Sequence, residues 1–140
     1  MESEMEITGI EEPVWLQNIP INQRMGRCYE LTGKFVTHGN FDWSAVYGVL
    51  IPDRGRHAGQ NYEHAWLERD AMVYDLVINM VATRNAYYRL YQVEVISRLS
   101  DNDLFKFTTE HGIWPSCDDV RSFALGTLEE RELTTTGTSR

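Results

Sequence analysis

The sequence predicts a single α+β domain, and two observations carry that prediction. Apolar residues recur at helical spacing near both ends of the chain, whereas the middle holds short runs rich in β-branched and aromatic residues. Helices that stand apart from a group of strands in this way are typical of the α+β class. A length of 140 residues with 42% apolar and 24% charged residues suits one domain, residues 1–140, with its own hydrophobic core.

The first predicted helix covers residues 28–37 (CYELTGKFVT) and is followed by a C-terminal glycine signal at residues 38–39. Gly33 lies inside this helix and costs about 1 kcal/mol relative to alanine, which indicates a close packing contact there. His38 is expected to act as a cation at the helix C-terminus. Three apolar residues share one face of the helix: Leu31, Phe35 and Val36.

The middle of the chain is predicted to form strands. Two of them are expected to pair as a hairpin that turns at residues 69–71, and a short helical segment over residues 84–90 precedes the last one. The strand-like segments are 43–51, 64–68, 72–76 and 91–96.

Two further helices are predicted after the strands. Ser100 is placed to cap the first of them, with Asp101 and Asp103 favourable in the first turn and Gly112 as the stop. The second is expected to run from Asp118 to Leu128.

Composition and charge exclude several classes of protein. Thirteen basic against 21 acidic side chains give a net charge of −8, which argues against general nucleic-acid binding and leaves an acidic mimic of nucleic acid as a minor alternative. No apolar run is long enough to cross a membrane, and the acidic N-terminus is no secretory signal. No phosphate-binding glycine motif occurs, so no nucleotide or other cofactor is expected. The acidic residues 1–12 and the polar residues 134–140 are expected to be loosely held.

The two cysteines, Cys28 and Cys117, do not form the dense framework of a small secreted scaffold, so we expect a cytoplasmic protein with reduced thiols. Cys28 is the informative one, because it stands where a loop becomes a helix. The positive end of the helix dipole favours a thiolate there, and the adjacent Arg27 adds charge of the right sign. Cys117 is expected to be inert.

A nucleophilic cysteine needs a base, usually a histidine that a third group orients. His64 is the best of four candidates because of the pattern HAWLERDAMVYD that begins with it. If the hairpin pairs Glu68 with Val73, His64 and Asp75 lie diagonally on one face, with backbones roughly 7–8 Å apart. An apolar set then falls on the other face: Ala65, Leu67, Tyr74 and Leu76.

These residues carry a resemblance to a known family. GRCY at a helix start, then HAW-x-E, then VYD is similar to the Cys–His–Asp core of the transglutaminase-like branch of the papain-like superfamily. RCYELTGKFVTHG, HAWLERDAMVYD and EHGIWPSCDD also resemble segments of small uncharacterised phage and bacterial proteins. The resemblance implies a small papain-like α+β fold with the cysteine helix packed on an antiparallel sheet. It also implies thiol chemistry at Cys28, with His64 as base and Asp75 as the residue that orients it.

Papain-like enzymes often carry an oxyanion-hole side chain, commonly glutamine, a few residues before the cysteine. The resemblance therefore implies this role for Gln23, with Asn22 nearly as good, beside the Cys28 backbone N–H at the helix start. Trp66 is expected to flank the site, as a packing residue or as a substrate-binding surface. The late segment GIWP departs from the order of the family-like pattern and predicts no site.

We therefore expect a thiol-dependent hydrolase or acyl or amide transferase that acts on a protein or a small amide or ester. Three alternatives stay open. Cys28 is a buried structural thiol in the first, and in the second it shares a zinc ion with His64 and Asp75, although no zinc motif supports that. In the third, the chain is an acidic binding or inhibitor protein that keeps the fold without catalysis. An exposed aromatic patch would favour this last alternative, built from Trp43, Tyr47, Tyr87 or Trp114.

Overall fold

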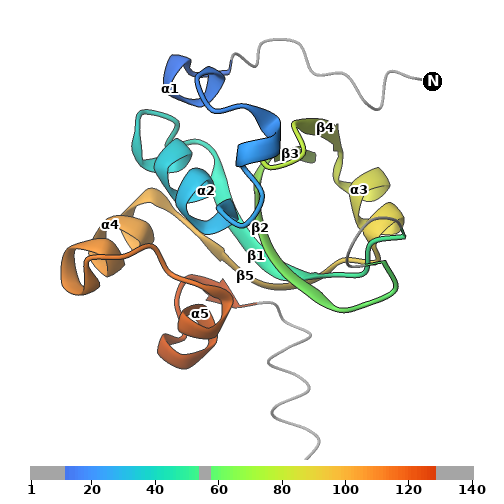
Figure 1. Cartoon of the computed structure of the whole chain (residues 1–140). Helices are drawn as coiled ribbons and strands as arrows, with labels where there is room; N and C mark the ends of the chain where they lie inside the picture. Colours follow the sequence, from blue (N-terminus) through green and yellow to red (C-terminus); the bar gives the residue numbers. More distant parts are fainter. Residues whose placement is uncertain (1–11, 54–57, 129–140) are drawn as a thin grey trace, which may run out of the picture.

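A computed structural model describes residues 12–53 and 58–128 of the chain (Figure 1). The fold is α+β, as the sequence predicts, and its centre is one open antiparallel sheet of six strands in the order β4-β3-β2-β1-β5-β6. The strands are β1 Ser44–Leu50, β2 Tyr62–Arg69, β3 Met72–Asp75, β4 Met80–Thr83, β5 Glu94–Leu99 and β6 Thr127–Leu128. The helices are α1 Val14–Gln17, the 3-10 helix η2 Ile21–Gln23, α2 Cys28–Thr37, α3 Arg84–Tyr91, α4 Asp101–His111 and α5 Cys117–Phe123.

Each face of the sheet has its own hydrophobic core. Helices α2, α4 and α5 lie on one side of the sheet, and α3 lies on the other (Figure 1). The larger core packs Leu31 and Phe35 of α2 against the sheet residues Ala65, Leu67 and Tyr74. The smaller core packs α3 against the opposite face of the sheet, through the buried residues Val46, Trp66, Val73, Ala82 and Tyr87.

The register of the central hairpin is the one that the sequence predicts. Glu68 pairs with Val73 across β2 and β3, and Arg69 pairs with Met72 next to the turn. All four residues of the predicted apolar face belong to the larger core: Ala65, Leu67, Tyr74 and Leu76. Alternation of side chains therefore fixes which face of β2 carries His64.

The packing contact predicted for Gly33 is confirmed. A Cβ atom added at this position would lie 2.7 Å from Cζ3 of Trp114, closer than real Cβ contacts come. The helix start and stop signals of α4 are confirmed as well, since Ser100 forms a capping box with Asp103 and Gly112 adopts a left-handed conformation. His38 lies at the C-terminus of α2, where its Nδ1 is 2.8 Å from the Lys34 carbonyl oxygen.

Several predicted boundaries are wrong. The strand expected at 91–96 is β5, Glu94–Leu99, because α3 continues to Tyr91 and Gln92 takes a left-handed turn conformation. The last helix does not reach Leu128, because Ala124 ends α5 in a left-handed conformation and the chain then forms β6. Strand β4 and the two short N-terminal helices were not predicted from the sequence. The expected loose ends lie outside the described residues, apart from Glu12.

Candidate active site

Cys28 is the first residue of α2, as predicted, and only 6% of it is exposed. The N-terminus of α2 has no side-chain cap, whereas Thr83, Ser100 and Ser116 cap the N-termini of α3, α4 and α5. The first N–H groups of a helix have no acceptor within that helix, and the macrodipole gives them a partial positive charge. The sulfur of Cys28 therefore lies beside backbone donors that no capping side chain occupies.

His64 and Asp75 meet on the sheet as the predicted register requires. His64 Nε2 lies 2.9 Å from Asp75 Oδ2, and the two side chains are 3% and 2% exposed. Strands β2 and β3 hold the pair, so both partners come from rigid elements of the sheet. A carboxylate bonded to one imidazole nitrogen fixes the tautomer and the ring orientation of the histidine.

The Asp75 carboxylate accepts two further hydrogen bonds. The hydroxyl of Tyr87 donates to Oδ2 at 2.6 Å, and the backbone N–H of Val77 donates to Oδ1 at 3.1 Å. Burial by itself would raise the pKa of Asp75, but the charge and the hydrogen bond of His64, followed by the Tyr87 and Val77 bonds, lower it below the ordinary value. Asp75 is consequently an ionised carboxylate at neutral pH.

The second imidazole nitrogen, Nδ1, is the one that the bond to Asp75 leaves free. It is buried and has no partner that meets both the distance and the angle of a full hydrogen bond within the described residues, yet Cys28 is close enough to affect its titration. Burial lowers the pKa of His64, but the Asp75 carboxylate and then Cys28 raise it to about 10. The structure therefore brings together all three residues of the predicted Cys28–His64–Asp75 set, in a geometry that favours an imidazolium.

Aromatic rings hold the imidazole on both faces. Tyr62 stacks on His64 with ring centroids 5.4 Å apart, and Trp66 stacks on it from the other side at 6.2 Å. Trp66 is fully buried, and its Nε1 donates to Glu68 at 2.9 Å. Trp66 is therefore a packing residue that supports the histidine, and a substrate-binding role for it stays a prediction.

Asn22 and Gln23 lie in η2, on the segment that leads into α2, with exposed side chains. Within the described part of the chain, neither side chain forms a hydrogen bond with the Cys28 side chain. The guanidinium of Arg27, next to Cys28 in the sequence, pairs with Glu30 at 2.9 Å. The oxyanion-hole role of Gln23 and Asn22 therefore stays a prediction.

Arg24 is a structural residue of the site that the sequence does not reveal. It is 2% exposed, although arginine is almost never fully buried without partners. Its guanidinium donates to the Leu76 carbonyl at 2.8 Å, and to Leu16 and Ile19 at 2.8 and 2.9 Å. These bonds join the segment before Cys28 to the segment directly after Asp75.

Cys117 packs beneath the site from α5. Its sulfur lies 3.8 Å from the carbonyl oxygens of both Gly48 and His64. Burial raises its pKa to about 11, against a smaller opposite effect of the hydrogen bond from Tyr29. Cys117 is therefore a protonated thiol at neutral pH, and its inertness stays a prediction.

The aromatic patch that would favour a binding protein does not form, because Trp43, Tyr47 and Tyr87 are buried in the cores.

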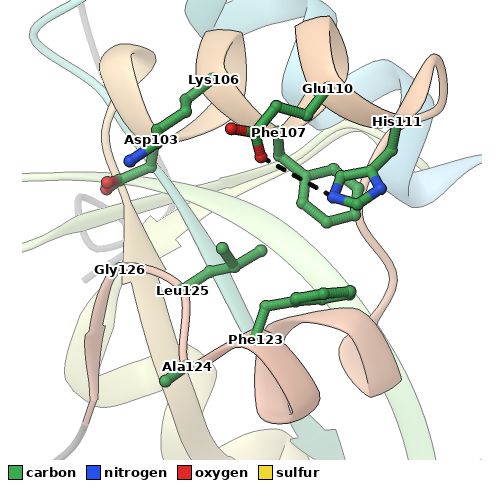
Figure 2. A pocket seen from close by; sticks show the side chains of 9 residues that line it. All are labelled: Asp103, Lys106, Phe107, Glu110, His111, Phe123, Ala124, Leu125 and Gly126. Atoms are coloured by element: carbon green, nitrogen blue, oxygen red, sulfur yellow. Dashed lines mark ion pairs between the residues drawn. The ribbon is translucent and has the colours of Figure 1, made fainter.

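A separate hollow lies between α4 and the end of α5, away from the triad (Figure 2). Its volume is about 380 Å³, and the rings of Phe107, His111 and Phe123 form its aromatic wall. His111 is the last residue of α4, and its ring packs 4.2 Å from that of Phe107. His57, the fourth histidine, lies outside the described residues.

Comparisons with known proteins find no match: no family model, no curated protein and no solved structure matches the chain.

Within residues 12–53 and 58–128, no group of three or more His, Cys, Asp or Glu side chains is arranged to hold a metal ion. None of the helices in the same residues has the length and apolar character needed to span a bilayer.

Proposed function

We propose that this protein is a cysteine-dependent hydrolase or acyl or amide transferase that uses a Cys28–His64–Asp75 triad, in a small fold of the papain-like type. The observation that carries the proposal is the order of contacts in a buried site. Asp75 holds His64 Nε2, which leaves Nδ1 free, and Cys28 is close enough to the imidazole to affect its titration. A nucleophile, a base and an orienting acid in that order form the general plan of nucleophilic catalysis by a thiol.

The burial of the pair supports a charged resting state. Because Asp75 is ionised and the pKa of His64 is raised, the imidazole keeps its proton at neutral pH and can act as the cation beside the Cys28 sulfur. A structural cysteine requires no oriented histidine beside it. The alternative of an inert packing thiol leaves the orientation of His64 Nδ1 unexplained.

The chemistry follows from these positions. The Cys28 thiolate attacks the carbonyl carbon of an amide or ester, forming a C–S bond while the carbonyl electron pair moves to oxygen. Backbone N–H groups at the start of α2 stabilise that oxyanion, and the exposed amides of Asn22 and Gln23 are near enough in sequence to add a donor on substrate binding. The oxyanion then collapses and expels the amine or alcohol, which takes its proton from the His64 imidazolium. Water or an acceptor amine, deprotonated by His64, finally cleaves the thioester and restores the thiolate.

An activated ester tests this proposal without knowledge of the substrate. Intact-mass measurements after mixing with p-nitrophenyl acetate should show one acetyl group on Cys28, which is then lost by hydrolysis. The His64→Ala variant should acetylate at least about a hundredfold more slowly, the scale of general-base assistance. The Cys117→Ser variant is the matched control, because it removes the other thiol and should leave the reaction unchanged. Equal acetylation of Cys28 and Cys117, or full reactivity in His64→Ala, would contradict the proposal.

A further inference from the structure

Helix α3 presents two successive tyrosines to two buried carboxylates of the sheet. Tyr87 donates its hydroxyl to Asp75, and Tyr88 donates its hydroxyl to Glu68. Glu68 has other partners, since Trp66 Nε1 donates to it at 2.9 Å and the guanidinium of Arg84 lies 3.2 Å away. Both tyrosines thus donate to a buried carboxylate, but of the two only Tyr87 donates to a member of the proposed triad.

The bond from Tyr87 falls on the oxygen that also binds the histidine. Asp75 Oδ2 accepts from Tyr87 at 2.6 Å and lies 2.9 Å from His64 Nε2, while Oδ1 accepts from Val77. Three donors on two oxygens fix the rotation of the carboxylate about its Cβ–Cγ bond. Tyr87 is itself immobilised, because it is fully buried and its ring packs on Trp66 at 5.5 Å and on Tyr91 at 5.0 Å.

We propose that Tyr87 is a positioning residue of the thiol site: its hydroxyl holds the ionised carboxylate of Asp75 against His64 Nε2, and so keeps Nδ1 directed at the sulfur of Cys28. This inference rests on the proposed function. It assigns to α3, which lies on the opposite side of the sheet from α2, a direct part in setting the reactivity of the thiol (Figure 1).

Several titratable groups surround the hydrogen bond between Tyr87 and Asp75, and they bear on what loss of this bond would do. The titratable groups that face Asp75 and Tyr87 are Cys28 from α2, His64 and Tyr62 from β2, and Tyr91 within α3. Loss of the Tyr87 hydroxyl removes one of the hydrogen bonds that lower the pKa of Asp75. Without that donor the carboxylate is free to rotate about its Cβ–Cγ bond, so it orients the His64 ring less firmly beside Cys28.

The test compares Tyr87→Phe with Tyr88→Phe, both in a Cys117→Ser background so that a single thiol reports. Each substitution removes one hydroxyl from one buried carboxylate and leaves the ring in place. The measured quantity is the rate of Cys28 alkylation by iodoacetamide as a function of pH. Tyr87→Phe should lose about tenfold in rate in mildly acid solution, where the thiolate depends most on His64, and should recover toward the parent rate as pH rises. Tyr88→Phe should keep the parent pH profile even if it loses thermal stability.

The outcomes separate this inference from the proposed function. An unchanged pH profile in Tyr87→Phe, with a parent protein that alkylates rapidly in mild acid, would overturn the positioning role alone. Equal shifts in Tyr87→Phe and Tyr88→Phe would also overturn it, because the effect would then be general loosening of α3. A parent protein that alkylates like an ordinary thiol would overturn both proposals.

A second measurement needs neither tyrosine variant, in case Tyr87→Phe does not fold. In the Cys117→Ser protein, the buried hydroxyl proton of Tyr87 should give an NMR signal that moves when Cys28 is alkylated, because alkylation removes the anion that His64 faces. A hydroxyl signal that does not respond to alkylation would contradict the connection from Tyr87 through Asp75 and His64 to the sulfur.

Discussion

Replacement of Arg24 should destabilise the protein far more than replacement of Arg27, although both arginines precede α2 and both pair with a glutamate. Arg24 is 2% exposed and pairs with Glu12 at 2.9 Å, whereas Arg27 is 38% exposed and pairs with Glu30 at the same distance. Ion-pair distance alone therefore predicts equal effects, and burial predicts very different ones.

The magnitude follows from what each variant leaves behind. Arg24→Ala removes a donor from two buried carbonyls, of which Leu16 keeps the Ile19 N–H and Leu76 loses its bond to the guanidinium; an unsatisfied buried acceptor costs about 1–3 kcal/mol. We expect a loss of about 3–5 kcal/mol, a large part of the roughly 5–15 kcal/mol that stabilises a domain of this size. Arg27→Ala breaks a solvent-screened pair and should cost at most about 1 kcal/mol.

Urea denaturation followed by tryptophan fluorescence measures both values on the same scale. Arg24→Lys provides a further control, because an ammonium group reaches fewer acceptors than the planar guanidinium and should restore only part of the lost stability. The reasoning would be refuted if the unfolding free energies of Arg24→Ala and Arg27→Ala lay within about 1 kcal/mol of each other.

Two further predictions concern the helix that carries Cys28 and the buried ion pair. Gly33→Ala should lower the free energy of unfolding by roughly 1–2 kcal/mol, because the new methyl group meets Trp114 and this cost exceeds the gain of about 1 kcal/mol in helix propensity. Thermal unfolding checks it, and a stabilised Gly33→Ala protein would show that the ring of Trp114 moves away freely. His64→Gln should cost more stability near pH 6 than near pH 10, as measured by denaturation at each pH. A folded-state pKa raised to about 10 gives stabilisation that is complete below the unfolded value of about 6.5 and is lost as pH rises through about 10. A cost that grows with pH would contradict that sign.

The part of the site that lies in one hairpin could be predicted from the sequence. Alternation of apolar residues fixes the register of β2 and β3, because a shift by one residue would move Leu67 and Tyr74 out of the larger core to the opposite face of the sheet. Once the register is set, the separation of His64 and Asp75 follows from the geometry of the sheet. The position of Cys28 at a helix start follows equally from local pattern.

The parts that depend on long-range packing could not be predicted in this way. Tyr87 meets Asp75 only because α3 folds back over β3, and nothing in the local sequence distinguishes Tyr87 from Tyr88. Arg24 looks like any surface arginine until three carbonyls gather around it. The last helix was predicted too long because apolar spacing continues past Ala124, whereas the chain must turn there to lay Gly126 against the Arg98 carbonyl.

The most direct test of the triad is the ultraviolet absorbance of the Cys28 thiolate, obtained as the difference between the parent protein and Cys28→Ser across a pH titration. The proposed triad predicts a thiolate signal that is already present at neutral pH and in mild acid, and that His64→Ala removes. A signal that appears only as pH rises through about 8.5, the value of an ordinary thiol, and that is the same in His64→Ala would contradict the account.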